Sequence, residues 1–148
     1  MTAMNFPIHI PFVEALGFEL MRFENGEAEI AMTPREEHMN SWSVLHGGVT
    51  MTLLDVVMAH ASRSPVAGAA ADSRGVVTIE MKTSFMRPGL GRLLARGKVL
   101  HRTVSFAFCE GSIVDAEGEL IAHATGTFKY LRALPAGGRQ LNKLNASD

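Results

Sequence analysis

A carboxylate in apolar surroundings is the first candidate for chemistry in this sequence. Asp55 is the single formally charged side chain between residues 44 and 61, and Leu54 and Val56 flank it. Burying a carboxylate is unfavourable unless it is hydrogen-bonded or paired, and burial raises its pKa. Such an acid is a candidate nucleophile or general base. The alternative is a carboxylate that bonds a neighbouring group and only fixes the packing.

The segment His46-Gly47-Gly48 supplies a second candidate group. Glycines allow a ligand to approach the backbone, and the N–H groups of a first helical turn lack partners within the helix. We expect an oxyanion to bind there, unless the glycines serve only close packing. On a helix, Gly48 and Asp55 share a face but lie about 10 Å apart along the axis, too far to act on one carbonyl. Two antiparallel helices about a twofold axis would bring them together across chains.

One long helix over residues 44–61 is predicted to position these groups. This stretch is apolar nearly all the way round, a pattern typical of a helix buried on several sides, and it is too polar and slightly too short to cross a bilayer. One sheet covers only part of such a helix, and large exposed apolar patches are uncommon on monomers. We therefore expect a homo-oligomer.

Strand patterns surround the predicted helix. A short helix over residues 8–17 precedes a hairpin with strands at 18–24 and 27–32 around an Asn-Gly turn. After a loose connection over residues 62–75, strand-like stretches follow at 76–86, 92–104 running into 105–114, and 119–131. Consecutive strands separated by short turns predict antiparallel pairing. We expect one domain over residues 1–132 and a flexible tail over 133–148.

Composition excludes several classes of function. With 14 Lys and Arg against 15 Asp and Glu, the chain has no basic field for nucleic acid or anionic membranes, so neither is an expected partner. The single Cys109 cannot form an internal disulfide, and the first residues lack a signal-peptide pattern, which indicates a cytoplasmic protein. Zinc-site, serine-hydrolase and phosphate-loop motifs are missing from the sequence. We expect no metal and no cofactor.

Three segments together resemble the PaaI-like hotdog-fold acyl-CoA thioesterases, with the likeness running over about residues 12–131. The segments are residues 40–55, 77–88 and 118–128. Their most specific feature is the His46-Gly47-Gly48 segment with Asp55 nine residues after the histidine and Asn40 six residues before it. The resemblance implies an α+β hotdog fold, in which a curved antiparallel sheet wraps a long central helix. It also implies dimers whose sheets join edge to edge, and often a dimer of dimers.

The same resemblance implies hydrolysis of an acyl-CoA thioester to free acid and CoA. Asp55 would act as nucleophile or general base, a choice that the sequence leaves open. The Gly47 N–H would polarise the thioester carbonyl, His46 and Asn40 would orient substrate or water, and the Thr78 hydroxyl would position the water. Thr78 stands where relatives often have serine.

Substrate binding is implied for a further set of residues. The turn over residues 101–106 commonly contacts CoA in the family, although it lacks the glycine that many relatives have there. His101 and Arg102 are cations that suit phosphate oxygens, unless they are simply solvated. The implied substrate-binding set is Gly48, Phe85, His101, Arg102 and Thr103.

Two alternatives from other classes stay open, a hotdog hydratase or dehydratase and a non-catalytic acyl-CoA-binding module. A dehydratase needs a catalytic histidine with an acid placed for β-elimination, whereas here the acid follows the thioesterase spacing. A binding module is expected to carry an effector segment, for which 148 residues leave little room. The acyl group itself is not set by the sequence: aryl, medium-chain and hydroxylated groups all fit.

Overall fold

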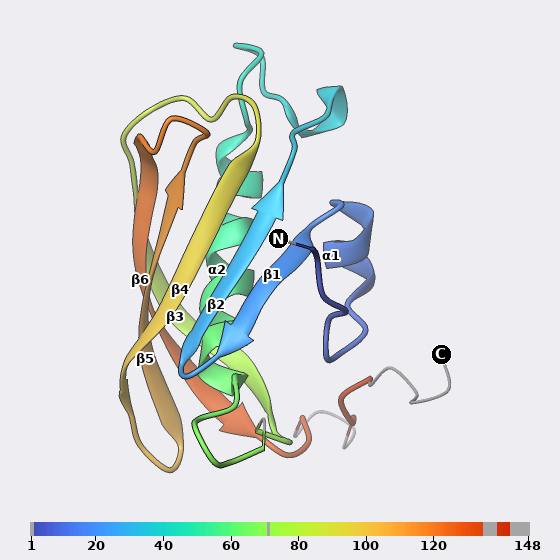
Figure 1. Cartoon of the computed structure of the whole chain (residues 1–148), viewed down its shortest axis with the longest axis vertical. Coiled ribbons are helices and arrows are strands. Elements are labelled where there is room, and N and C mark those ends of the chain that lie inside the picture. The colour runs from blue at the N-terminus through green and yellow to red at the C-terminus, as the bar shows by residue number, and fades with distance from the viewer. Residues whose placement is uncertain (1, 71, 135–138, 143–148) are drawn as a thin grey trace.

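One long helix lies along a curved six-stranded antiparallel sheet (Figure 1). The computed structural model describes residues 2–70, 72–134 and 139–142. The elements are α1 (Pro11–Ala15), β1 (Glu19–Glu24), β2 (Glu27–Met32), the 3-10 turn η1 (Glu36–His38), α2 (Gly47–Arg63), β3 (Gly75–Phe85), β4 (Leu93–Arg102), β5 (Phe106–Val114) and β6 (Leu120–Leu131). The predicted α+β architecture, a long helix against a curved antiparallel sheet, is confirmed.

The strand order is β1-β2-β4-β5-β6-β3. Antiparallel pairing of consecutive strands is confirmed for β4, β5 and β6, but β3 pairs with β6 and not with β4, whose other neighbour is β2. The turn after β3 therefore crosses to the far side of β5 and β6, a choice that strand spacing alone does not encode. As a result, β3 is an outer strand, and no strand in the described ranges pairs with its other edge.

The predicted hairpin is also confirmed, and its turn is fixed to the end of α2. Asn25 and Gly26 have φ angles of 54° and 74°, as a two-residue hairpin turn requires. The Gly26 N–H donates to Ser64 Oγ over 2.8 Å, and the Asn25 N–H donates to the Pro65 carbonyl over 2.6 Å. These bonds hold the C-terminal end of α2 against the hairpin.

One face of α2 packs very closely on the sheet. Its fully buried side chains are Leu53, Leu54, Val57, Met58 and Ala61. Close approach depends on Gly97 of β4, where an added Cβ would lie 2.5 Å from the Val57 carbonyl oxygen. The opposite face, which carries Asp55 and Ala59, is only partly buried, and Met51 on it is 36% exposed. A single chain thus covers only one side of the apolar helix.

Several predicted boundaries need correction. Helix α2 begins at Gly47 and ends at Arg63, and the first helix covers only Pro11–Ala15. The connection predicted over residues 62–75 begins within α2, and its two ends are joined where the Arg63 Nε donates to the Arg74 carbonyl over 2.7 Å. The predicted flexible tail lies mostly outside the described residues. Within its described part, the Asn142 carbonyl accepts from the His9 N–H over 3.0 Å.

Among the described residues, no helix has both the length and the apolar character needed to span a membrane.

Adding one methyl group at Gly97 is expected to separate α2 from the sheet. The Gly97→Ala variant should lower the free energy of unfolding by about 2 kcal/mol or more, because the new Cβ meets backbone that cannot move aside. Urea unfolding at a fixed protein concentration measures this change. Gly126→Ala is the matched control, since its Cβ meets the flexible end of Met58 at 3.1 Å and the ring of Phe128 at 3.0 Å. Equal losses in the two variants would contradict the prediction.

Candidate active site

The carboxylate of Asp55 lies on α2 and is bonded by a residue of β3. The Thr78 hydroxyl donates to Asp55 Oδ1 over 2.6 Å. Burial raises the pKa of Asp55 above its ordinary value, and the hydrogen bond from Thr78 opposes this change only in part. The structure thus brings together Asp55 and Thr78, the residue that the resemblance assigned to positioning the water, and joins them by a direct hydrogen bond.

The first turn of α2 leaves one glycine N–H available. His46 is the N-cap residue, and its Nδ1 accepts from the Gly48 N–H over 2.8 Å. The neutral ring therefore carries its proton on the exposed Nε2. No acceptor for the Gly47 N–H is found among the described residues. Gly47 is consequently the free donor of the pair, whereas the Gly48 N–H already serves as the partner of the cap.

Asn40 organises the loop that leads to His46. Its Oδ1 accepts from the N–H groups of Trp42 and Val44 over 2.8 and 3.3 Å. Its own N–H donates to the Val44 carbonyl over 2.8 Å, and the His46 N–H donates to the His38 carbonyl over 2.9 Å. These bonds set the position of the helix start, and the Asn40 amide nitrogen is the part of the side chain left to bind water or substrate.

Phe85 borders the same turn. Its ring lies 3.5 Å from where a Cβ on Gly47 would be, and the side chain is 55% exposed. The structure therefore places Phe85 beside the candidate oxyanion donor.

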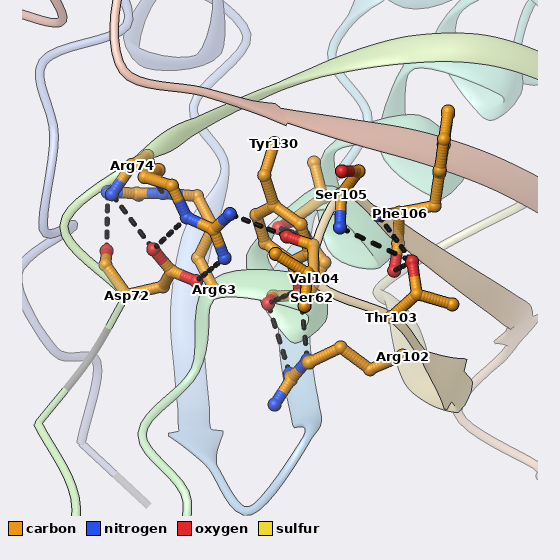
Figure 2. Close-up of polar contacts among 11 residues, drawn as sticks. Ser62, Arg63, Asp72, Arg74, Arg102, Thr103, Val104, Ser105, Phe106 and Tyr130 are labelled. Atoms are coloured by element: carbon orange, nitrogen blue, oxygen red, sulfur yellow. Dashed lines mark hydrogen bonds and ion pairs between the residues drawn. The ribbon is translucent and has the colours of Figure 1, made fainter.

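The residues predicted to contact CoA lie at the other end of α2 (Figure 2). Arg102 donates to the Ser62 carbonyl over 3.0 Å and to the Tyr130 hydroxyl over 2.9 Å. The Thr103 hydroxyl oxygen accepts from the Phe106 N–H over 2.9 Å and closes the turn. The 17 residues of α2 separate these groups from Gly47 by about 25 Å. They do not share a site with Gly47 within one chain.

His101 is exposed and differs from Arg102 and Thr103 because its side chain does not take part in the hydrogen bonds that hold this turn. It stacks on Phe108 with the ring centroids 6.1 Å apart. Of the three predicted residues in this turn, His101 is thus the one whose side chain makes no hydrogen bond within the described residues.

A cavity of about 300 Å³ runs along the outer face of α2 and includes Asp55 and Thr78. The full lining is Ile8, Ile10, Phe12, Val13, Thr52, Asp55, Val56, Ala59, His60, Arg63, Val76, Thr78 and Leu141. The sequence analysis missed most of these residues. For the helix, the sequence does contain a usable pattern. Ala59 and Arg63 follow Asp55 at intervals of four residues and therefore lie on the same helix face. For residues 8–13, no comparable pattern points to the cavity.

His60 lines the same cavity and is 2% exposed within a single chain. Its Nδ1 lies 2.8 Å from the Val56 carbonyl oxygen. Burial lowers the pKa of His60 to about 4, so the ring is neutral near pH 7. A neutral ring that bonds a carbonyl carries its proton on Nδ1 and exposes a lone pair on Nε2.

Cys109 is buried, and burial raises the pKa of its thiol to about 12. In the ranges that the structure describes, no group of three or more His, Cys, Asp or Glu side chains could hold a metal ion.

Comparison with known proteins identifies the family. The profile of the Thioesterase superfamily matches residues 43–122, which include the first turn of α2, Asp55 and Thr78. The chain belongs to the thioesterase superfamily. The medium/long-chain acyl-CoA thioesterase YigI of Escherichia coli K12 is 32% identical over 136 residues, covering 83% of this chain and 87% of YigI.

Solved structures agree with this family and with the predicted hotdog fold. The conserved protein PA5202 of Pseudomonas aeruginosa superposes with a TM-score of 0.77 at 26% sequence identity. The matched region covers 84% of this chain and 97% of PA5202. A mutant of the phenylacetic acid degradation protein PaaI of Thermus thermophilus has a TM-score of 0.71 at 31% identity, covering 82% of this chain and all of that one.

The bond from Thr78 is expected to control the ionisation of Asp55. In Thr78→Val the carboxylate loses the hydrogen bond that lowers its pKa, so the pKa of Asp55 should rise further. Thr78→Ser keeps the hydroxyl and should leave the pKa near that of the parent. Carbon-13 NMR titration of the Asp55 carboxyl measures both. A pKa that is unchanged or lower in Thr78→Val would show that this bond does not stabilise the ionised form.

Proposed function

We propose that this protein hydrolyses acyl-CoA thioesters to the free acid and CoA. The observation that carries the proposal is the Asp55 carboxylate, which is held by Thr78, has a raised pKa and lines a largely apolar cavity. Membership of the thioesterase superfamily supports the reaction type, and the name of the E. coli relative supports an acyl-CoA substrate. CoA enters as part of the substrate, and the proposed reaction needs no other cofactor.

Asp55 acts as a general base in this proposal. Thr78 holds Oδ1, and Oδ2, which has no partner among the described residues, takes a proton from water. The water oxygen then forms a bond to the thioester carbonyl carbon, and the carbonyl electron pair moves onto oxygen. A raised pKa makes the carboxylate a stronger base, which favours this route over direct attack by Asp55.

The Gly47 N–H stabilises the developing oxyanion. Collapse of the tetrahedral intermediate breaks the carbon–sulfur bond, and the departing CoA thiolate takes up the proton that Asp55 accepted. The Asn40 amide nitrogen and the His46 Nε2–H are donors near the helix start that can orient water or substrate. Phe85 packs beside the carbonyl, next to Gly47.

The complete site needs two copies of the chain. Gly47 and Asp55 are eight residues apart on α2, which corresponds to about 12 Å along the axis. We place Gly47 of one copy opposite Asp55 of the other in a twofold dimer. The outer edge of β3 and the half-exposed face of α2 are surfaces that such a dimer would cover. The opposite sheet edge is partly used, since the Met4 N–H donates to the Leu20 carbonyl of β1 over 2.7 Å.

Antiparallel packing of the two α2 helices also gives the turn after β4 a role. It brings the C-terminal end of α2 in one copy toward the first turn of α2 in the other. His101 then lies near the second chain's Gly47 and can contact CoA. Arg102 and Thr103 act through their internal hydrogen bonds, which hold this turn in place.

Replacing Asp55 by asparagine should remove hydrolysis without unfolding the protein. Asn has nearly the same shape but cannot take a proton, so Asp55→Asn should lower the rate of CoA release by about a hundredfold or more. Burial disfavours the ionised carboxylate of Asp55 in the folded protein. The contribution of this residue to stability is therefore largest below the pKa that Asp55 has in the unfolded chain, and it is lost as the pH rises through the higher pKa of the folded state. The variant should therefore be at least as stable as the parent at pH 7.

A free-thiol assay on a panel of aryl- and alkyl-CoA thioesters, with thermal unfolding in parallel, tests this prediction. Glu80→Gln makes the same acid-to-amide change on β3, outside the cavity, and should keep the parental rate. Full turnover by Asp55→Asn would remove Asp55 from the mechanism. A parent protein that releases no CoA from any thioester would overturn the proposed function.

Mixing two inactive variants is expected to restore activity. Gly47→Val crowds the carbonyl position, although an added Cβ there meets Phe85 at an ordinary 3.5 Å. In a heterodimer with Asp55→Asn, one site carries both lesions and the other carries none. Random pairing makes about half of the dimers mixed, each with one intact site of two, so activity after mixing and refolding should approach about a quarter of the parental value. Well-folded mixed dimers without activity would place both groups in one chain.

A further inference from the structure

The cavity beside Asp55 has a second polar end. Asp55 of α2 and Thr78 of β3 lie at one end of the lining, and the lining residues His60 and Arg63 follow Asp55 five and eight residues later along α2, with Arg63 on the face of Asp55. Eight helical residues span about 12 Å. Between these positions the lining includes Val56 and Ala59, so an extended apolar stretch separates two polar groups.

Arg63 presents a buried donor that the fold leaves without an acceptor. The residue is 5% exposed, and its Nε and Nη2 donate to the backbone carbonyls of Arg74 and Asp72 over 2.7 and 3.3 Å. Its Nη1 is buried and has no hydrogen-bond partner among the described residues. Buried polar atoms are rarely left unpaired, so an unpaired guanidinium nitrogen on a cavity residue indicates a ligand group that accepts from it.

The positive charge of Arg63 is only weakly balanced. The nearby carboxylate of Asp72 is bonded by Arg74, through its Nε at 3.1 Å and its Nη2 at 2.9 Å (Figure 2). Arg102 adds a further cation where it bonds the Ser62 carbonyl. Three guanidinium groups and one carboxylate thus lie at this end of α2, which suits an electron-rich or anionic ligand group.

His60 adds an acceptor to this end of the cavity. With its proton on Nδ1 toward the Val56 carbonyl, the buried Nε2 offers a lone pair and has no partner among the described residues. Edges of the Phe6 and Phe23 rings pack around the imidazole, with centroids at 5.2 and 6.2 Å. Two residues that line the cavity therefore carry one donor and one acceptor without a partner among the described residues.

We propose that the cavity holds the acyl part of the substrate and that Arg63 and His60 select acyl groups with an oxygen function, a hydroxyl or a carboxylate, at the distal end. This inference rests on the proposed function for its acyl-CoA substrate. An oxygen at that end accepts from Arg63 Nη1, and a hydroxyl also donates to His60 Nε2. A methyl terminus would leave both buried atoms unpaired, which costs free energy.

Binding of thioether analogues of CoA, which cannot be hydrolysed, tests the proposal directly. For each of several chain lengths, the S-alkyl, S-(ω-hydroxyalkyl) and S-(ω-carboxyalkyl) derivatives are titrated into the full-length protein by calorimetry. At the best length, the hydroxyl or carboxylate derivative should bind about tenfold or more tightly than the alkyl derivative. Alkyl derivatives that bind as tightly as both oxygenated forms at every length would overturn the proposal.

Variants assign the preference to Arg63. In Arg63→Met the dissociation constants of the alkyl and the oxygenated derivatives should become equal to within about twofold. Arg63→Lys keeps a charged donor and should retain part of the preference. Arg92→Met removes an arginine from outside the cavity and should keep the parental ratio. A ratio unchanged in Arg63→Met would refute the assignment. If Arg63→Met does not fold, the ratios of the parent and of Arg63→Lys decide.

A parallel assay of CoA release from the matching thioesters separates this proposal from the proposed function. Selective binding without CoA release would support distal recognition and overturn hydrolysis. CoA release at equal rates from alkyl and oxygenated thioesters, with equal binding of the thioethers, would support hydrolysis and overturn distal recognition.

Discussion

The backbone of α2 rests against the backbone of β4, and the candidate site depends on this contact. Gly97 permits it, because any side chain there would collide with the Val57 carbonyl. Leu54, Val57 and Met58 face the sheet and fix the orientation of the helix about its own axis. In this orientation Asp55 faces β3. The distance between the helix and the sheet also determines that a threonine of β3 reaches the carboxylate. Packing in the core thus sets the geometry of the polar groups on the opposite face.

The two ends of α2 present opposite electrostatic environments. At the first turn, His46 caps one N–H and leaves the Gly47 N–H available, where the helix carries partial positive charge. At the last turn, the Ser62 carbonyl accepts from Arg102 and from the Tyr130 hydroxyl, which matches the partial negative charge of that end. Asp55 lies between the two ends on a face of intermediate burial. A hydrogen-bond donor, a carboxylate and a cation thus lie at defined positions along one helix.

Much of the fold could be predicted from local patterns, because turns and helix starts have strong chemical signatures. The Asn25-Gly26 turn and the start of α2 at His46-Gly47-Gly48 follow from backbone angles and capping that few residue types provide. The neighbour of β3 could not be predicted in this way, since both β4 and β6 suit antiparallel pairing and only the path of the turn after β3 decides. The site shows the same division. The contact of Asp55 with Thr78 follows from a resemblance, whereas the cavity position of Arg63 depends on carbonyls at residues 72 and 74 that long-range folding brings close.

The outer position of β3 also affects the tendency of the isolated chain to aggregate. Its 11 residues give an isolated chain a long sheet edge with no partner strand in the described ranges, and such edges promote aggregation. Glu80 and Lys82 are exposed on this strand, and charged side chains on an edge disfavour indiscriminate pairing. A second copy of the chain with complementary charges could still pair with this edge, whereas pairing with unrelated strands is disfavoured. The strand that carries Thr78, the partner of Asp55, is thus also an edge whose charged side chains disfavour aggregation.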